Sequence, residues 1–356
     1  MNGLTHIFFL AAVACVLTAF LMLALRRPAC RAGLVDEPGG RKRHEGSVPL
    51  IGGIGIFLSF LAVVVVQPLS LREYLPLFAA MTFLLLIGVI DDLVDIQASM
   101  KLVAQMFAAV LVTSWGNVQI DALGNILGTG TIPLGDWSIP VTVFALVGLI
   151  NALNMLDGID GLAGGFSLLA LMIFAWALFS VGSDEAGVLA TLLAASVAGF
   201  LIHNFRTPWR RRARVFLGDA GSMILGLAVG WFAIEVGNAG TSCISPVTVL
   251  WVLALPVIDT LSLMLRRMAK GRSPFYADRE HLHDVFKRAG FSDEVSAYIL
   301  MGVSVALALV GVGATCIGVP DGVLLIALLL VGGMHYYFIA HAWRILRIIR
   351  RRRGLS

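Results

Sequence analysis

The chain is made of long apolar stretches, each about as long as a bilayer-crossing helix, separated by short polar segments. A membrane-spanning helix needs about 20 consecutive apolar residues, because each residue adds only about 1.5 Å to its length. Windows of that length predict about eleven spans. They are residues 5–25, 50–68, 74–91, 101–116, 138–155, 165–181, 186–204, 216–236, 246–265, 296–318 and 322–342.

The composition excludes a water-soluble fold. Of the 356 residues, 58% are hydrophobic and 13% are charged, whereas a soluble domain is about 45–50% apolar and about 25% charged. The apolar runs do not alternate with period two, as the strands of a membrane barrel would. We therefore expect an all-α integral membrane protein whose residues 1–356 form one polytopic domain. No basic segment precedes the first apolar run, so we expect a retained anchor and not a cleaved signal.

The four cysteines, Cys15, Cys30, Cys243 and Cys316, lie in separate segments. Their spacing matches no zinc motif, and it suggests no disulfide framework. We expect neither feature.

The basic residues predict the orientation of the chain. If the first loop is cytoplasmic, 25 of the 26 Lys and Arg residues face the cytoplasm and only Arg72 lies outside. Cytoplasmic loops carry such an excess of positive charge. The N-terminus is then outside and the C-terminus is cytoplasmic. Segments 206–215 and 266–295 become cytoplasmic loops that contribute to any active site, and 343–356 becomes a basic cytoplasmic tail. Because orientation explains the charge, we expect no nucleic-acid partner.

Three carboxylates, Asp91, Asp92 and Asp95, stand at the cytoplasmic end of the third predicted span. If the helix continues, Asp91 and Asp95 lie one turn apart on one face. Carboxylates crowded at a lipid border repel one another unless they share a cation. Mg²⁺ is the natural partner, because it binds through one or two carboxylates together with substrate phosphates. The alternative is a solvated helix end.

Two further runs carry polar residues at the same face. In Asn151-Ala-Leu-Asn154-Met-Leu-Asp157-Gly-Ile-Asp160-Gly, spacings of three place the first three polar residues on one stripe. Amides inside a span are costly unless they are paired or used, so helix–helix hydrogen bonding remains the alternative for Asn151. In Phe216-Leu-Gly-Asp219-Ala-Gly-Ser222, the aspartate either holds a metal or caps a helix.

A fourth group lies in the longest cytoplasmic loop, where Asp278-Arg279-Glu280-His281-Leu-His283-Asp284 places two histidines beside an arginine. These side chains are suited to gripping a pyrophosphate, although they are also compatible with an ordinary loop. No Cys or third His nearby completes a zinc set. The glycines Gly52, Gly53, Gly55, Gly226 and Gly230 are interpreted as sites of close helix packing, without chemistry.

Together these runs resemble the polyprenyl-phosphate N-acetylhexosamine-1-phosphate transferases. The resemblance covers nearly the whole chain, from Gly33-Leu-Val-Asp36-x-Pro38 and Arg41-Lys42-x-His44 to Arg288-Ala-Gly-Phe-Ser292. The runs that begin at Asn151 and at Val215 are its most specific parts. The members most similar to this chain use UDP-N-acetylglucosamine and undecaprenyl phosphate. The resemblance therefore implies transfer of N-acetylglucosamine 1-phosphate to that lipid, with release of UMP. It also implies a bacterial inner membrane with a periplasmic N-terminus, and a homodimer.

The resemblance also implies a role for each matching residue. Asp91 and Asp92 match the family's paired aspartates, one of which deprotonates the lipid phosphate. Asp219 matches the Mg²⁺ ligand, for which Mn²⁺ is a substitute, and Asn204 matches an amide beside that metal. The remaining matches are substrate-binding positions: Asn154, Asp157 and Asp160 for the nucleotide sugar, and Arg279, His281 and His283 for the loop that closes over the sugar and pyrophosphate. The chain departs from the pattern at Asp284, where relatives carry another histidine, so the contact there stays open.

Three rival functions fit less well. A prenyl-transferring enzyme would need a second Asp-rich motif, and Asp157-Gly-Ile-Asp160 is a poor one. A CDP-alcohol phosphotransferase would need Asp-Gly-x-x-Ala-Arg, which does not follow Asp157 or Asp160. A transporter would place ionisable groups near the bilayer midplane between inverted repeats, whereas here they gather at one face. Another UDP-N-acetylhexosamine is the alternative donor.

Overall fold

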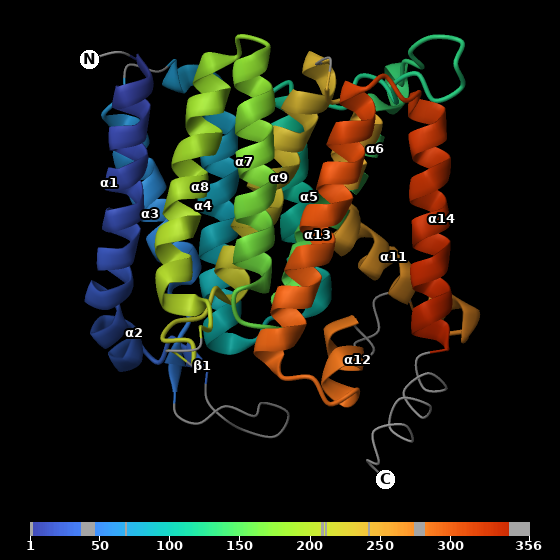
Figure 1. Ribbon diagram of the computed structural model, residues 1–356. Coiled ribbons are helices and arrows are strands. Elements are labelled where there is room, and N and C mark those ends of the chain that lie inside the picture. The colour runs from blue at the N-terminus through green and yellow to red at the C-terminus, as the bar shows by residue number, and fades with distance from the viewer. Residues whose placement is uncertain are drawn as a thin grey trace. The chain divides into compact units, whose positions relative to one another are not determined.

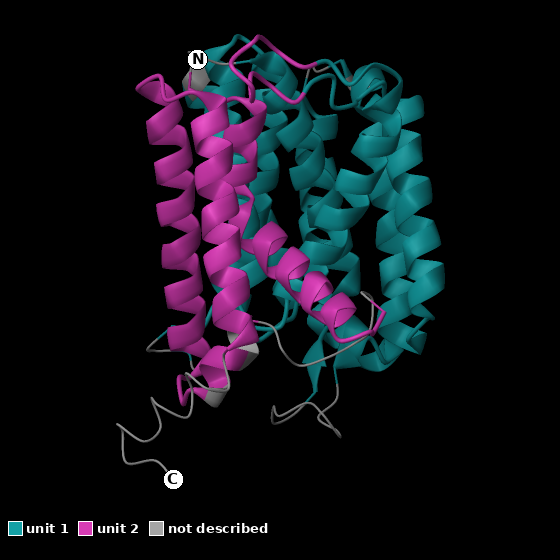
Figure 2. Ribbon diagram, turned by 90° about the vertical axis from the view of Figure 1, so that its right-hand side faces the viewer, with its two compact units in different colours: residues 1–122, 133–241 teal, residues 123–132, 242–356 magenta. Residues whose placement is uncertain are grey.

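Helices make up most of the protein (Figure 1), as a computed structural model shows for residues 3–36, 47–67, 70–207, 210, 212–240, 243–273 and 282–341. The two strands are short: β1 (Val35–Asp36) pairs antiparallel with β2 (Val48–Pro49). The chain divides into two compact units, residues 1–122 with 133–241 and residues 123–132 with 242–356. Figure 2 distinguishes them as unit 1 and unit 2 by colour.

The chain is a multi-pass membrane protein. Within the described ranges, eight helices are long and apolar enough to cross a bilayer, and a bent helix pair brings the number to nine if it counts as one span. Many large apolar side chains on these helices are exposed, among them Phe144, Leu309 and Leu329, which suits contact with lipid. Each predicted window contains a helix, but α3 and α5 have only 14 and 17 residues. The expected count of eleven spans therefore stays a prediction.

Unit 1 contains the first nine α-helices, a short 3₁₀-helix and both strands. Its helices are α1 (Gly3–Ala24), α2 (Arg26–Ala32), α3 (Gly52–Val65), α4 (Leu71–Val94), α5 (Ala98–Ser114), η1 (Gly135–Trp137), α6 (Ser138–Leu156), α7 (Leu162–Ser180), α8 (Asp184–Asn204) and α9 (Gly218–Ala239).

Helix α9 lies at the centre of unit 1, where it packs against α3, α4, α6 and α7 and is almost wholly buried. Glycines allow these close approaches. A Cβ at Gly226 would lie 2.6 Å from the Cα of Ile150 on α6, and one at Gly230 would lie 2.7 Å from Cδ2 of Leu146. The interpretation of these glycines as packing sites is confirmed.

The start of α3 fixes the segment that leads into α9. The N–H groups of Gly52 and Gly53 donate to the carbonyls of Phe216 and Leu217, at 2.9 and 3.1 Å. A Cβ at Gly53 would lie only 2.4 Å from the backbone nitrogen of Gly221. Because the two backbones nearly touch, the first turn of α9 is held in one position.

Unit 2 is built around a bent pair of helices. Its helices are α10 (Pro246–Val252), α11 (Ala254–Ala269), α12 (Leu282–Arg288), α13 (Asp293–Cys316) and α14 (Asp321–Ala340). α10 and α11 meet at an angle of 81°. Trp251 lies in the core beside this bend, and its indole N–H donates to the carbonyl of Leu324 at 3.1 Å.

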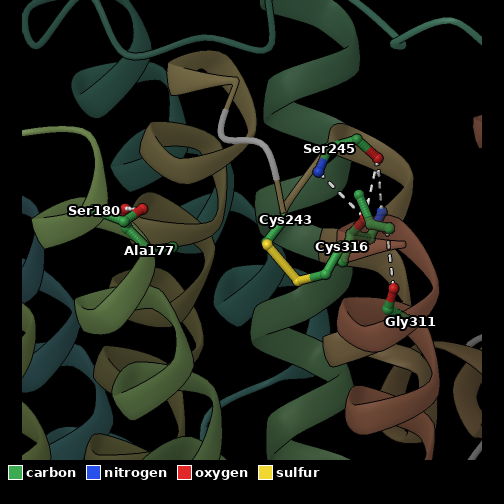
Figure 3. The surroundings of a disulfide bond; sticks show 8 residues. Ala177, Ser180, Cys243, Ser245, Gly311 and Cys316 are labelled. Atoms are coloured by element: carbon green, nitrogen blue, oxygen red, sulfur yellow. Dashed lines mark hydrogen bonds between the residues drawn. A yellow bond between two sulfur atoms is a disulfide. The ribbon is translucent and has the colours of Figure 1, made fainter. Parts of the chain in front are cut away.

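A disulfide joins Cys243, just before α10, to Cys316, the last residue of α13. Figure 3 shows the bond beside the capping box of α10, in which Ser245 and Thr248 exchange hydrogen bonds. The expectation of no disulfide was wrong. Sequence spacing gave no signal because 73 residues separate the two cysteines, and only the packing of α10 on α13 brings them together.

Substituting Gly53 with Ala should destabilise the protein, because the added Cβ would force the α3 and α9 backbones apart. Overpacking of this kind costs about 1–3 kcal/mol. Gly148→Ala is the matched control: it lies on α6, and a Cβ there would meet nothing within 4 Å. The measurement is the midpoint of thermal unfolding in detergent. Equal midpoints for the two variants would contradict the tight contact.

Candidate functional site

Four helix ends of unit 1 bring polar side chains to one place. Asp91 and Asp92 stand near the end of α4, Lys101 near the start of α5, Asn154 near the end of α6 and Asp219 in the first turn of α9. The first and last of these residues, Asp91 and Asp219, are 128 positions apart along the chain. The site depends on the alternating directions of the helices, which place the ends of α4 and α6 beside the starts of α5 and α9.

Lys101 sits between two carboxylates. Its Nζ lies 2.7 Å from Oδ2 of Asp91 and 3.3 Å from Oδ2 of Asp219. The Asp91 side chain is almost fully buried, and its Oδ2 makes no contact with hydrogen-bond geometry. The attraction between Asp91 and Lys101 is therefore mainly one of charge. An uncompensated carboxylate is costly when it is buried, so this ammonium is needed to hold the two acids together.

Asp92 caps α9 from a neighbouring helix. Its Oδ1 accepts from the Asp219 N–H at 2.8 Å, and its Oδ2 accepts from the Ala220 N–H at 3.3 Å. The first N–H groups of a helix have no partner within it, and a carboxylate there also interacts favourably with the helix dipole. The Asp219 side chain does not cap its own helix, since it is bound to Asn154 and Lys101.

Gly218 makes the Asp92 contact possible. Its φ of +75° is left-handed, and a Cβ at this position would lie 2.6 Å from Oδ2 of Asp92. Asp95 does not join the cluster, because α4 ends at Val94 and Asp95 itself adopts a left-handed conformation with φ of 52°. Asp91 and Asp95 would share a helix face only if α4 continued through Asp95, and it does not.

The two asparagines of α6 have different partners. The Asn154 amide donates to Oδ1 of Asp219 at 2.5 Å and to the Ser222 hydroxyl at 2.9 Å. It therefore orients the carboxylate of Asp219. The Asn151 amide donates to Oε1 of Gln105 at 2.6 Å. This is the helix–helix hydrogen bond that the sequence left open for Asn151.

The segment after α6 adds two more acids. Burial raises the pKa of Asp157 well above its ordinary range, and the negative charges of Asp219 and of two other aspartates add to the rise. Asp160 is neutralised by Arg206, whose Nε lies 2.6 Å from its Oδ2. Asp157 thus belongs to the same electrostatic cluster as Asp219, whereas Asp160 ties the segment to residue 206 of the basic loop.

Both the oxygen and the nitrogen of the Asn204 side-chain amide form hydrogen bonds with the main chain. Its Oδ1 accepts from the Gly161 N–H at 2.7 Å, and its Nδ2 donates to the Val215 carbonyl at 2.9 Å. It therefore joins the segments that precede α7 and α9. The role of Asn204 beside a metal stays a prediction.

The expected substrate loop falls largely outside the described residues. Arg279 and His281 lie outside them, and so does the side chain of His283, whose backbone belongs to α12. Their roles stay predictions.

The chemistry of the cluster fits a divalent cation. Asp91 and Asp219 already have a positive group between them, and the buried Oδ2 of Asp91 is paired with that ammonium at 2.7 Å. Within the described ranges, no three His, Cys, Asp or Glu side chains form a ready-made metal cage. Mg²⁺ commonly binds through one or two carboxylates and takes its other ligands from water and phosphate. Asp91 and Asp219 are residues that could hold it in this way.

Comparison with known proteins identifies the family. Residues 74–237 match the model of glycosyl transferase family 4, and this range contains all the site residues placed above. A Haemophilus influenzae protein is 36% identical over 337 residues, which cover 94% of this chain and 95% of the relative. The chain belongs to glycosyl transferase family 4. An Escherichia coli K12 protein is 35% identical over 353 residues, which cover 99% of this chain and 95% of the relative. Both relatives are named undecaprenyl-phosphate alpha-N-acetylglucosaminyl 1-phosphate transferase.

Two residues of this family 4 site were not proposed from the sequence. Lys101 was counted only as a loop charge, although it is the sole Lys or Arg between positions 72 and 206, and a lone cation at the start of an apolar helix is a usable signal. Arg206 was likewise treated as part of a basic loop. Its partner, Asp160, lies 46 positions away, and nothing in the local sequence links the two.

Replacing Asp92 with Asn should destabilise this family 4 enzyme. The amide retains one acceptor oxygen, so it cannot receive both N–H groups at the start of α9. Loss of a helix cap costs about 0.5–2 kcal/mol. Asp95→Asn is the matched control, since its side chain is exposed three positions away. Thermal unfolding should separate the two variants. If both melted like the parent protein, the cap would contribute little.

Proposed function

We propose that the chain transfers N-acetylglucosamine 1-phosphate from UDP-N-acetylglucosamine to undecaprenyl phosphate, with release of UMP. One observation carries the proposal: Asp91, Asp92, Asn154 and Asp219 converge in a chain that aligns with its relatives over nearly their full length. The printed names of those relatives state the lipid and the sugar phosphate. We further propose that the product starts a lipid-linked surface glycan such as O-antigen, and that the enzyme works as a homodimer.

The reaction joins two phosphates. An oxygen of the lipid phosphate attacks the phosphorus that carries the sugar, and the bond between that phosphorus and the bridging oxygen of the donor's pyrophosphate breaks. UMP leaves with the bridging oxygen, and a sugar diphospholipid remains. Phosphate ionises with a second pKa of about 6, so the acceptor is largely charged at neutral pH without a strong base. We therefore assign more of the catalytic effect to positioning than to proton removal.

Each site residue has a task in this reaction. Asp219 and Asp91 would hold Mg²⁺, which would supply neutralising charge on the donor's phosphates when bound. Asn154 orients the Asp219 carboxylate, while Asp92 fixes the backbone on which Asp219 stands. Both oxygens of Asp92 are engaged by backbone N–H groups of α9, whereas Oδ2 of Asp91 is paired with the side-chain ammonium of Lys101 at 2.7 Å. This difference favours Asp91 as the group that faces the acceptor phosphate.

The enzyme lies in the bacterial inner membrane with its active site at the cytoplasmic face, with eleven spans and a periplasmic N-terminus. Two observations support this orientation. Nearly all Lys and Arg residues fall on one side of the predicted spans. The disulfide between Cys243 and Cys316 joins segments on the other side, and disulfides persist in the periplasm but are rare in the cytosol.

The reaction is tested by following UMP release from purified protein with undecaprenyl phosphate, Mg²⁺ and a panel of UDP-sugars. UDP-N-acetylglucosamine should be the best donor. Asp219→Asn should lower the rate at least about a hundredfold, because even residues behind metal ligands contribute 10–100-fold. Asp136→Asn, an exposed acid in η1, should leave the rate unchanged.

The same assay can contradict the proposal. No UMP from any donor with folded protein would refute the reaction, and a different best donor would refute the sugar. A stoichiometric burst of UMP without lipid would favour a covalent aspartyl intermediate over direct attack. UMP release that persists in the presence of a metal chelator would show that the reaction does not need Mg²⁺.

Orientation can be tested with a thiol reagent that does not cross membranes. Cys30 is exposed on α2, and Asp184 is exposed at the start of α8. In intact spheroplasts the reagent should label Asp184→Cys but not the native Cys30, which should react only after the cells are permeabilised. The opposite pattern would invert the topology.

A further inference from the structure

A cavity lies at the end of unit 1 that is remote from the carboxylate site. It has a volume of about 720 Å³ and is lined by the start of α4, the end of α5 and the last third of α9. Ligand pockets typically have about 300–1,000 Å³. Tyr74 in its wall is 17 residues from Asp91 along α4, or about 25 Å at 1.5 Å per residue. The reaction proposed above does not use this cavity.

Aromatic rings form much of the cavity wall. Tyr74 and Trp231 are buried and meet edge to face, with their ring centroids 5.8 Å apart. Trp115 is 58% exposed where α5 ends, and Leu75 is 47% exposed beside it on α4. The cavity therefore has an aromatic interior and an apolar border that faces the surroundings. Aromatic faces attract cations, most strongly where water is excluded.

Charged groups of both signs line the same cavity. Glu235 is only partly exposed on the otherwise apolar α9, and Glu73 and Arg72 stand at the start of α4. No side chain of these three forms a salt bridge or hydrogen bond within the part of the chain that the structure describes. Arg72 is also the one Lys or Arg that the predicted topology places outside. Arg72 and Glu73 are exposed, whereas Glu235 is a partly buried carboxylate on a membrane-spanning helix, and its lack of a partner among the described residues indicates a ligand that supplies one.

We propose that this cavity binds the headgroup of phosphatidylethanolamine. The ammonium group pairs with Glu235 among the aromatic rings, where its N–H bonds suit a carboxylate, and the phosphate pairs with Arg72. The lipid is the occupant, and not a free phosphoethanolamine, because Leu75 and Trp115 offer the acyl chains an apolar border. A lipid that is only anionic would leave Glu235 without a partner.

Native mass spectrometry of the full chain in detergent tests the proposal, with phosphatidylethanolamine, phosphatidylglycerol and phosphatidylcholine offered separately at equal concentration. Phosphatidylethanolamine should bind most tightly. Glu235→Gln should weaken it about five- to tenfold, which is the range of one charged contact with cation–π support. Arg72→Gln should weaken it similarly and, because Arg72 is exposed, should not disturb folding. Asp136→Asn is the control and should bind like the parent protein.

Three results would overturn the proposal. The first is equal binding of the three lipids by the parent protein. The second is unchanged phosphatidylethanolamine binding in both Glu235→Gln and Arg72→Gln. The third is displacement of the lipid by equimolar soluble phosphoethanolamine, which would show that the cavity takes a free molecule. None of these readouts depends on UMP release, so the lipid-binding proposal is tested independently of the proposed reaction.

Discussion

The ammonium group of Lys101, held between Asp91 and Asp219, is the interaction on which the site of unit 1 depends. Two acids this close would repel each other in a largely buried position, and each would tend to take up a proton. One positive charge lets both remain near the ends of their helices. It also marks where a divalent cation would act, since a cation that neutralises phosphate needs the same oxygens. The same carboxylates, Asp91 and Asp219, are thus neutralised by Lys101 in the fold and would bind the cation in the proposed reaction.

The rest of the site serves to hold Asp219. Asp92 fixes its backbone, Asn154 fixes its carboxylate, and the start of α3 presses against the turn that follows. Each contact comes from a different helix, so displacement of any of these helices would move Asp219. Positioning of this kind matters for phosphoryl transfer, where little covalent chemistry is left to the protein. The glycines at 53 and 218 contribute because any side chain there would separate these parts.

The membrane imposes a second constraint. Within lipid, every backbone group must be satisfied inside the protein, so spanning segments are helices. Polar side chains are costly there unless they have partners, which is why Asn151 on α6 pairs with Gln105 on α5. Glu235 departs from this rule, since its partly buried side chain lacks a partner within the described residues. That departure is the reason to assign it a ligand.

The sequence by itself determined the class of fold, and it placed a helix in each predicted window and pointed to most of the carboxylates and amides that the structure brings together. Apolar runs of bilayer length and clustered carboxylates are local features, and local features are visible in a single chain. Only the tertiary structure decided which carboxylates meet. Asp95 is three residues from Asp92 and stays outside the cluster, while Asp219 is 127 residues away and joins it. The partners of Lys101, the cap that Asp92 provides and the bond between Cys243 and Cys316 were hidden for the same reason: each depends on which helix ends lie side by side, and that is set by packing and not by spacing along the chain.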